Sequence, residues 1–230
     1  MTVISDNEKT WDVIAESFDK TRKKPWEECI SFIQKIPKVS NVVDLACGNG
    51  RHLIPAAKHC KKVIGVDISS ELLKITKEKI KNEGLKNVFL IHSDVTSIPI
   101  DSNSVDYILF IAALHNIKGK ENRIKALKEV KRILKKDGKA LISVWSRWQD
   151  KFRKEFFKKY FKQISNLEFG DINIYWKQHG LNVPRFYHLY SKKEFVNDLK
   201  KAGLKIEELK GQKIKSKKYA DNYFALVTKL

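Results

Sequence analysis

The feature that most constrains the fold is a regular alternation, after Pro37, of short apolar runs with amphipathic segments. The apolar runs "NVVDLA", "KVIGVD", "VFLIHS", "VDYILFI" and "KALISVW" have the length of strands. Helical periodicity begins near Arg51, Ser69 and Glu121, and Gly138 is expected to stop the last of these helices. Strands that alternate with helices need crossover connections, so the pattern predicts an α/β fold with a largely parallel sheet covered on both faces.

Segments on either side of this core complete one predicted domain, residues 1–230. Residues 7–36 predict two helices joined near Pro25. The chain ends with the pattern of a helix from about Lys192 to Ala202 and of two strands, "LKIEELK" and "NYFALVTK". These two strands are expected to close the sheet as a hairpin.

The charge balance indicates polyanionic partners. The chain has 46 Lys and Arg against 27 Asp and Glu, a formal net charge of +19. A positive field of this size concentrates polyanions whatever the fold, so nucleic acid is the leading partner. Residues 147–163 interleave basic and aromatic residues in a predicted helix or loop, a composition that suits RNA phosphates and unpaired bases. The alternatives are lysines that only keep the chain soluble and aromatic residues that pack into the domain.

Cysteine usage and hydropathy favour a cytoplasmic protein. Cys29, Cys47 and Cys60 show no CxxC spacing, so neither a disulfide framework nor a cysteine zinc site is expected. No apolar run approaches the roughly 20 residues of a membrane span, and acidic residues stand where a signal peptide would be apolar. We therefore expect a soluble protein with no membrane partner.

The stretch "VVDLACGNGRHLIP" indicates what the core holds. An apolar strand ends in a turn with Gly48 and Gly50 and then feeds a helix, so bare backbone lies close to any ligand above the turn. This arrangement suits a nucleotide-like molecule. A zinc site built from Cys47, Cys60 and the nearby histidines is disfavoured because Cys47 lies inside the turn, and no metal is expected.

Acids follow the next two strands. Ligands of open parallel sheets bind beyond the carboxyl ends of the strands, where Asp67 and Asp94 stand. A carboxylate at 67 can accept hydrogen bonds from two ribose hydroxyls, and Asp94 is placed to meet an exocyclic amine of adenine. A nicotinamide dinucleotide site uses similar features, but its fingerprint would require glycine where Leu53 stands. The residues favour a cofactor without a pyrophosphate, such as S-adenosylmethionine.

These motifs resemble those of the class I S-adenosylmethionine-dependent methyltransferases. "DLACGNG", the "GVD" of the second strand and "SDVTSIPIDSNSVDYILF" are similar to the glycine loop, ribose acid and post-adenine motif of that family. The resemblance implies a Rossmann-like, seven-stranded, mostly parallel sheet with one antiparallel strand. It divides the domain into N-terminal helices (1–37), a cofactor-binding core (38–146), an insertion and substrate-side region (147–190), and a C-terminal helix and hairpin (191–230).

A narrower resemblance comes from residues that the cofactor does not need. "VIAESFDKTRKKPW", the run from "IAALHN" to "ALISVW", and "GDINIYWKQHGLNVPRFYHLYSKKEF" are similar to tRNA methyltransferases that esterify a carboxymethyl group on the wobble uridine, including the methyltransferase part of the AlkB-homologue 8 type. Two departures occur: Asn116 follows His115 where two histidines are usual, and Tyr175 stands where a proline before the tryptophan is common.

The resemblance implies methyl transfer to a carboxylate oxygen of 5-carboxymethyluridine in the tRNA anticodon. A carboxylate is already ionised at neutral pH, so the protein must position an anion for in-line attack. Arg22 has a second possible role on the methionine carboxylate of the cofactor, and Arg123 has an alternative as a solvated surface charge. The implied catalytic residues are Arg22, His115, Arg123, Arg185, Tyr187 and His188, beside Trp145. The implied cofactor-binding residues are Asp44, Ala46, Gly48, Gly50, Asp67, Ile68, Asp94, Val95 and Ala112.

Two rival functions stay open at this point. One is a small-molecule methyltransferase of the same fold, and the other is a non-catalytic, cofactor-binding regulatory protein. Members of the family also commonly work with a small zinc-binding activator subunit that covers an edge of the sheet. The resemblance therefore adds such a subunit to tRNA as an expected partner.

Overall fold

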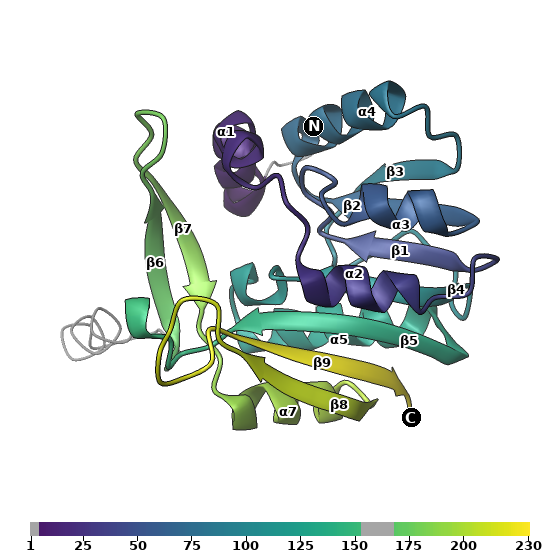
Figure 1. Ribbon diagram of the computed structural model, residues 1–230. Coiled ribbons are helices and arrows are strands. Elements are labelled where there is room, and N and C mark those ends of the chain that lie inside the picture. The colour runs from purple at the N-terminus through teal and green to yellow at the C-terminus, as the bar shows by residue number, and fades with distance from the viewer. Residues whose placement is uncertain (1–4, 153–167) are drawn as a thin grey trace.

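The computed structural model describes residues 5–152 and 168–230, with elements labelled as in Figure 1. Two helices precede an alternation of strands and helices, as the sequence predicts. The first elements are α1 (Asp6–Thr21), α2 (Glu27–Gln34), β1 (Asn41–Leu45), α3 (Leu53–His59), β2 (Lys62–Asp67), α4 (Ser70–Asn82), β3 (Val88–His92) and β4 (Val105–Ile111). The later ones are the 3-10 turn η1 (Leu114–Asn116), α5 (Lys120–Ile133), β5 (Leu134–Trp145), β6 (Asp171–Trp176), β7 (Val183–His188), α7 (Lys192–Lys201), β8 (Leu204–Gln212) and β9 (Asn222–Lys229).

Within the described residues, seven strands form one sheet in the order β3-β2-β1-β4-β5-β9-β8. The first five are mutually parallel, whereas β9 runs antiparallel to both β5 and β8. The predicted seven-stranded sheet with one antiparallel strand is thus confirmed. Strand order reverses at β1, which pairs with β2 on one side and β4 on the other. Such a switch point opens a crevice beyond the carboxyl ends of the strands.

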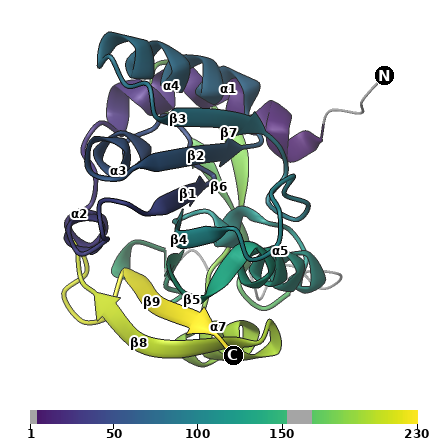
Figure 2. The ribbon, with the colours of Figure 1, turned by 90° about the vertical axis from the view of Figure 1, so that its right-hand side faces the viewer.

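Helices cover both faces of the sheet, with α2 and α3 on one and α5 and α7 on the other (Figure 2). An apolar core lies on each face of the sheet, and neighbouring residues of β1 point into different cores. Val42 packs in the core with α2 and α3, and Val43 packs in the core with α5 and α7. Both residues are fully or almost fully buried. Burial on both faces explains the continuous apolar runs of these strands. No helix among residues 5–152 and 168–230 has the length and apolarity to cross a membrane.

Two local expectations are corrected. Gly138 does not stop a helix, because α5 ends when Leu134 turns extended and Gly138 lies inside β5. A Cβ at Gly138 would lie 2.8 Å from the carbonyl oxygen of Asp106 on β4, so close approach of the strands requires glycine there. The second correction concerns β6 and β7, which form a separate two-stranded hairpin that the sequence did not predict. Most of the predicted basic insertion, 147–163, lies outside the described residues.

The β6–β7 hairpin stands beside α1, beyond the carboxyl edge of the sheet (Figure 1). The Nε1 of Trp176 donates to Ser17 Oγ at 2.8 Å, and the same hydroxyl bonds Nδ1 of His179 at the hairpin tip at 2.7 Å. Helix α1 therefore joins the hairpin to the core. Both elements stand at the edge of the sheet where the switch point lies (Figure 1).

Candidate cofactor and substrate site

The turn after β1 holds three residues in left-handed backbone conformation, with φ of 55° at Ala46, 55° at Gly48 and 77° at Gly50. The carbonyl of Gly48 accepts a hydrogen bond from Thr76 Oγ1 of α4 at 2.8 Å. A Cβ at Gly50 would lie 2.9 Å from Thr76 Cγ2. The glycines thus meet two demands, positive φ and close packing of the turn on α4.

Gly50→Ala is expected to lower the free energy of unfolding by about 2–3 kcal/mol, because left-handed strain adds to overpacking against Thr76. The matched control is Gly84→Ala, where φ is also positive, 63°, but nothing lies within 4 Å of an added Cβ. Strain alone should cost the control about 1 kcal/mol. Urea unfolding measures both, and equal losses would contradict the packing explanation.

Asp67 ends β2 directly beside this turn. Its two carboxyl oxygens accept from the backbone N–H of Gly48 at 2.7 Å and of Ser69 at 2.8 Å. Asp67 therefore fixes the glycine turn and the start of α4, and each oxygen keeps a further lone pair for a hydroxyl donor. Burial raises the pKa of Asp67 to about 6, against the lowering effect of the two backbone donors.

Asp44 lies on β1 below the turn and is 2% exposed. Its Oδ2 is buried with no hydrogen-bond partner in the part of the chain that the structure describes. A buried, unpartnered carboxyl oxygen calls for a donor from a ligand. Together, the glycine turn, the Asp67 lone pairs and this orphaned oxygen fit S-adenosylmethionine, which carries ribose hydroxyls, an ammonium group and a sulfonium.

The burial of Asp44 predicts a pH-dependent stability. Burial, and next the charge of Asp67, raises the pKa of Asp44 to about 8, from about 3.9 in an unfolded chain. The protonated Asp44 carboxyl therefore makes its full contribution to the free energy of unfolding at low pH, and this contribution is lost as the pH rises through the folded pKa. Between about pH 5 and 7.5 the free energy of unfolding of the cofactor-free protein should fall by about 1 kcal/mol per pH unit relative to Asp44→Asn. Chemical unfolding across this range tests it, and parallel pH curves for the two proteins would refute it.

The remaining cofactor-binding candidates lie in loops at the same edge of the sheet. Ile68 follows β2, and its carbonyl bonds His92 Nε2 at 2.7 Å. Asp94 and Val95 follow β3, where Asp94 Oδ1 accepts from the N–H of Thr96 at 2.7 Å. Ala112 follows β4 with a φ of 54°. The structure thus gathers all nine predicted positions at the carboxyl ends of β1 to β4, and their contacts with the cofactor stay predictions.

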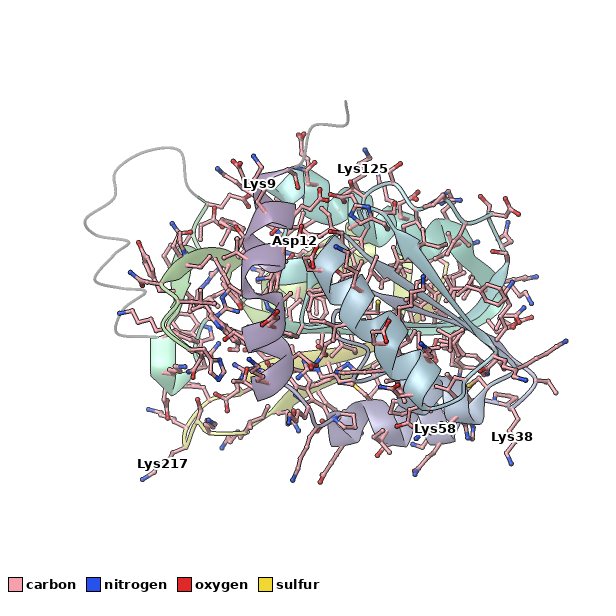
Figure 3. The ribbon with its side chains drawn as sticks, turned by 90° about the horizontal axis from the view of Figure 1, so that it is seen from above. Lys9, Asp12, Lys38, Lys58, Lys125 and Lys217 are labelled. Carbon is pink, nitrogen blue, oxygen red and sulfur yellow. The ribbon has the colours of Figure 1, made fainter. Side chains whose placement is uncertain are left out.

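Helix α1 is tied to the glycine turn by acids that the sequence analysis missed. Asp12 accepts from Ser69 Oγ at 2.6 Å and from the N–H of Glu71 at 3.1 Å, across to α4 (Figure 3). Asp19 accepts from Asn49 Nδ2 at 2.8 Å and pairs with Lys79. These bonds join residues that are far apart in the sequence, so no local motif predicts them.

An arginine and aromatic cluster faces α1 from the hairpin. The guanidinium of Arg185 lies 4.7 Å from the ring centroid of Trp176, and Nη1 donates to Tyr187 Oη at 2.6 Å. The guanidinium of Arg22, after α1, lies 5.2 Å from the same Trp176 ring. Burial lowers the pKa of Arg185 and the charge of Arg22 lowers it further, whereas Tyr187 acts in the opposite direction. Two neighbouring cations on one ring form a natural site for an anion.

His115 on η1 lies beneath this cluster and is 1% exposed. The backbone N–H of Trp145 donates to Nδ1 at 3.1 Å, so the neutral ring carries its proton on Nε2. Burial lowers the pKa of His115 to about 3, which keeps it neutral. Its ring stacks on Tyr187 with centroids 5.3 Å apart. His115 therefore offers a fixed N–H donor, and a proton-accepting role is disfavoured.

Arg123 and His188 belong to a different network. Arg123 is 0% exposed and donates to Glu168 Oε2 at 2.6 Å, so the alternative of a solvated surface charge is wrong. His188 binds Asp171 Oδ1 at 2.6 Å and Glu194 Oε1 at 3.0 Å, which leaves neither ring nitrogen free. The structure thus brings Arg22, His115, Arg185 and Tyr187 together and places Arg123 and His188 as supports of the surrounding elements.

One group among the described residues has the donor types of a metal site: Glu168, His188 and Glu194, whose ligand atoms lie within 4.8 Å of one another. These carboxylates already pair with buried guanidinium groups, Glu168 with Arg123 at 2.6 Å and Glu194 with Arg147 at 2.7 Å. A divalent cation would have to displace both pairs. The absence of a metal cofactor stays our prediction.

Comparisons with known proteins agree with this geometry. A family model described as a methyltransferase domain matches residues 43–142. A tRNA (carboxymethyluridine(34)-5-O)-methyltransferase of Schizosaccharomyces pombe is 30% identical over 212 residues, covering 87% of this chain and 89% of that protein. The alkbh8 tRNA (carboxymethyluridine(34)-5-O)-methyltransferase of Xenopus tropicalis is 36% identical over 155 residues, 67% of this chain. The chain covers 23% of that protein and 24% of the Macaca fascicularis one, about a quarter of each.

The chain is also similar to a methyltransferase with another substrate in its name and to solved methyltransferase structures. A demethylmenaquinone methyltransferase of Staphylococcus carnosus is 30% identical over 174 residues, covering 71% of this chain and 70% of that protein. Among solved structures, an S-adenosylmethionine-dependent methyltransferase of Methanosarcina mazei matches with a TM-score of 0.74 at 19% identity, over 90% of this chain and 99% of that one. A Haloferax volcanii putative methyltransferase, solved in complex with the Trm112 methyltransferase activator, matches with a TM-score of 0.67 at 15% identity, over 98% and 97%. The sheet order, the glycine turn and these relatives agree: the chain belongs to the class I S-adenosylmethionine-dependent methyltransferases.

Proposed function

We propose that this methyltransferase esterifies the carboxylate of 5-carboxymethyluridine at the wobble position of a tRNA anticodon. The observation that carries the proposal is the pair of arginines, Arg22 and Arg185, against the single ring of Trp176. The Nε of Arg185 is buried without a hydrogen-bond partner among the described residues, so a donor is left for an incoming group. A planar carboxylate is the anion that a guanidinium fork accepts best.

The chain's own residues need only hold the acceptor. S-adenosylmethionine supplies, when bound, a methyl group on a positively charged sulfur, and the carboxylate needs no base because it is already ionised. Arg185 and Arg22 would bind the carboxylate, and the Nε2–H of His115 would donate to the uridine. Tyr187 positions Arg185 through the 2.6 Å bond and stacks on Trp145 at 4.8 Å. Catalysis by positioning suits a site with donors and no free base.

The relatives support this acceptor over the rivals. The Schizosaccharomyces pombe protein, matched over 89% of its length, acts on carboxymethyluridine by its name. The Staphylococcus carnosus relative makes a small-molecule methyltransferase the alternative, but the exposed Arg22 and the buried Arg185 on one ring suit an anion better than an apolar quinone ring. The net charge of +19 favours an RNA substrate, and an enzyme that modifies tRNA is placed in the cytoplasm by the same proposal.

An activator subunit would cover the β3 edge of the sheet. The other edge strand, β8, carries a bulge near Glu208 and several charged residues, features that protect an edge from pairing. Strand β3 instead exposes Phe89, which is 52% exposed. The Haloferax volcanii neighbour was solved with such an activator. We expect co-expression with a Trm112-type protein to raise solubility, whereas a fully active lone chain would argue against the subunit.

Nucleoside mass spectrometry of tRNA from cells that lack the gene tests the function. We expect unesterified 5-carboxymethyluridine to accumulate. The purified protein, given methyl-labelled S-adenosylmethionine and this tRNA, should transfer label that mild alkali releases as methanol, because a methyl ester hydrolyses and a methyl group on carbon or nitrogen does not. Absence of label in RNA, or label that resists alkali, would contradict the proposal.

A further inference from the structure

A cavity of about 350 Å³ lies along α7, with Lys120 at the start of α5, Arg147, Glu168 and Phe169 on its other side, outside the cofactor and substrate site; we call it the α5–α7 groove. The two helices pack on each other on the same face of the sheet (Figure 2). The charged side chains that line the cavity include three lysines and three carboxylates: Lys120, Lys193, Lys201, Glu168, Glu194 and Asp198. How these charges are matched decides which ligand the cavity suits.

Two of the three carboxylates are already paired with buried cations. Glu168 pairs with Arg123 and also accepts from the first N–H of α5 at 2.7 Å. Glu194 pairs with Arg147 and with His188. Asp198 is 0% exposed and accepts from the hydroxyl of Tyr190 at 3.4 Å, its other oxygen has no partner among the described residues, and burial raises its pKa, which favours the uncharged form. Glu168 and Glu194 therefore serve the protein's own interior.

The three lysines, in contrast, are exposed and have no ion-pair partner within 4.0 Å among the described residues. Six other lysines of the described residues do form ion pairs: Lys58, Lys74, Lys79, Lys135, Lys205 and Lys210. The same helices carry further exposed lysines that form no ion pair within the part of the chain that the structure describes: Lys125 (Figure 3), Lys128, Lys192 and Lys200. This face thus carries several positive charges that no acid of the described residues matches.

The groove begins next to the proposed substrate site. Helix α5 starts four residues after Asn116, the end of the turn that carries His115, and α7 starts shortly after the strand that carries Tyr187. Both helices point their N-termini, which favour negative charge, toward this junction. A chain of phosphates that leaves the site would meet Lys120 and Lys193 first.

We propose that the α5–α7 groove binds the phosphate backbone of the RNA that flanks the methylated nucleotide. The proposal rests on the proposed function and names the surface on which its substrate lies. The groove supplies affinity and orientation without base contacts, because ammonium groups bind phosphates independently of sequence. The methyl transfer itself does not involve these lysines.

The test is a triple charge reversal, Lys120→Glu, Lys193→Glu and Lys201→Glu, in the full chain. The matched control reverses Lys77, Lys81 and Lys86, which are equally exposed and lie in or just after α4. Fluorescence anisotropy with the tRNA, at several salt concentrations, gives affinity and salt dependence. A neutral triple variant to glutamine should change affinity in the same direction by less, and calorimetry with S-adenosylmethionine should show unchanged cofactor affinity in all variants.

The groove variant is expected to lose tRNA affinity by about tenfold or more at 0.1 M salt. The plot of the logarithm of its binding constant against the logarithm of salt concentration should become less steep by about 2–3. The control should change affinity by less than about threefold at the same salt. Equal losses of tRNA affinity in both variants would show that the overall positive charge, and not the groove, binds the RNA. Wild-type affinity in the groove variant would likewise contradict the proposal. If the wild-type protein itself neither binds nor methylates RNA, the proposed function fails, which is a different result from a failed groove.

Discussion

Asp67→Ala is expected to weaken the binding of S-adenosylmethionine by about 2 kcal/mol or more, roughly 30-fold, because charge-assisted hydrogen bonds to the ribose are lost. The structure gives a second reason, since the same carboxylate holds the N–H groups of Gly48 and Ser69. Removal of these bonds would loosen the glycine turn and the start of α4 together.

Isothermal titration calorimetry measures this effect directly. The control is Asp101→Ala, which removes an exposed carboxylate after β3 and should leave cofactor affinity unchanged. Circular dichroism verifies that the Asp67 variant is folded. A folded variant with wild-type affinity would show that Asp67 does not hold the cofactor.

Arg185→Lys should reduce kcat/KM for the RNA substrate by about 100-fold or more while leaving cofactor affinity unchanged. Lysine keeps the charge but cannot present a planar fork to a carboxylate. It also loses the stacking on Trp176 and the bond to Tyr187. Because the carboxylate must be aligned for attack, the loss should appear in kcat/KM for the RNA and not in the affinity for the cofactor.

Methyl transfer to tRNA, with titration of the cofactor, separates the two contributions. The control is Lys177→Ala, an exposed cation at the start of the loop between β6 and β7, which should keep nearly full activity. If the Arg185 variant lost cofactor affinity in parallel with activity, the residue would belong to the cofactor site. Unchanged activity would remove it from the substrate site altogether.

The core of this fold was predictable because its signals are local. A strand buried on both faces is a continuous apolar run, as in β1 and β4, and the glycine turn follows its strand directly. Acids at strand ends, such as Asp67, are then placed by the parallel topology alone. The C-terminal hairpin was predictable for the same reason, since β8 and β9 are adjacent in sequence and close the sheet.

Contacts between side chains that are far apart in the sequence could not be predicted. Arg123 lies on an amphipathic helix pattern with many charged neighbours, and its partner Glu168 is 45 residues away. The contacts of Asp12 with α4 span 57 and 59 residues. Strand β7 mixes aromatic, polar and charged residues on both faces, which hides its strand pattern. Strand β6 does alternate, with Ile172, Ile174 and Trp176 on one face, and the sequence analysis missed this local signal. For Arg123 and Asp12, in contrast, a partner distant in sequence decides the structure.

The central claim is that one crevice holds S-adenosylmethionine on Asp67 and the glycine turn, and an RNA carboxylate on Arg22 and Arg185. A crystal structure with S-adenosylhomocysteine and a 5-carboxymethyluridine nucleotide tests it most directly. We expect the ribose hydroxyls on the Asp67 carboxylate and the substrate carboxylate between the two guanidinium groups. A ribose bound away from Asp67, or a carboxylate that contacts neither arginine, would contradict the account.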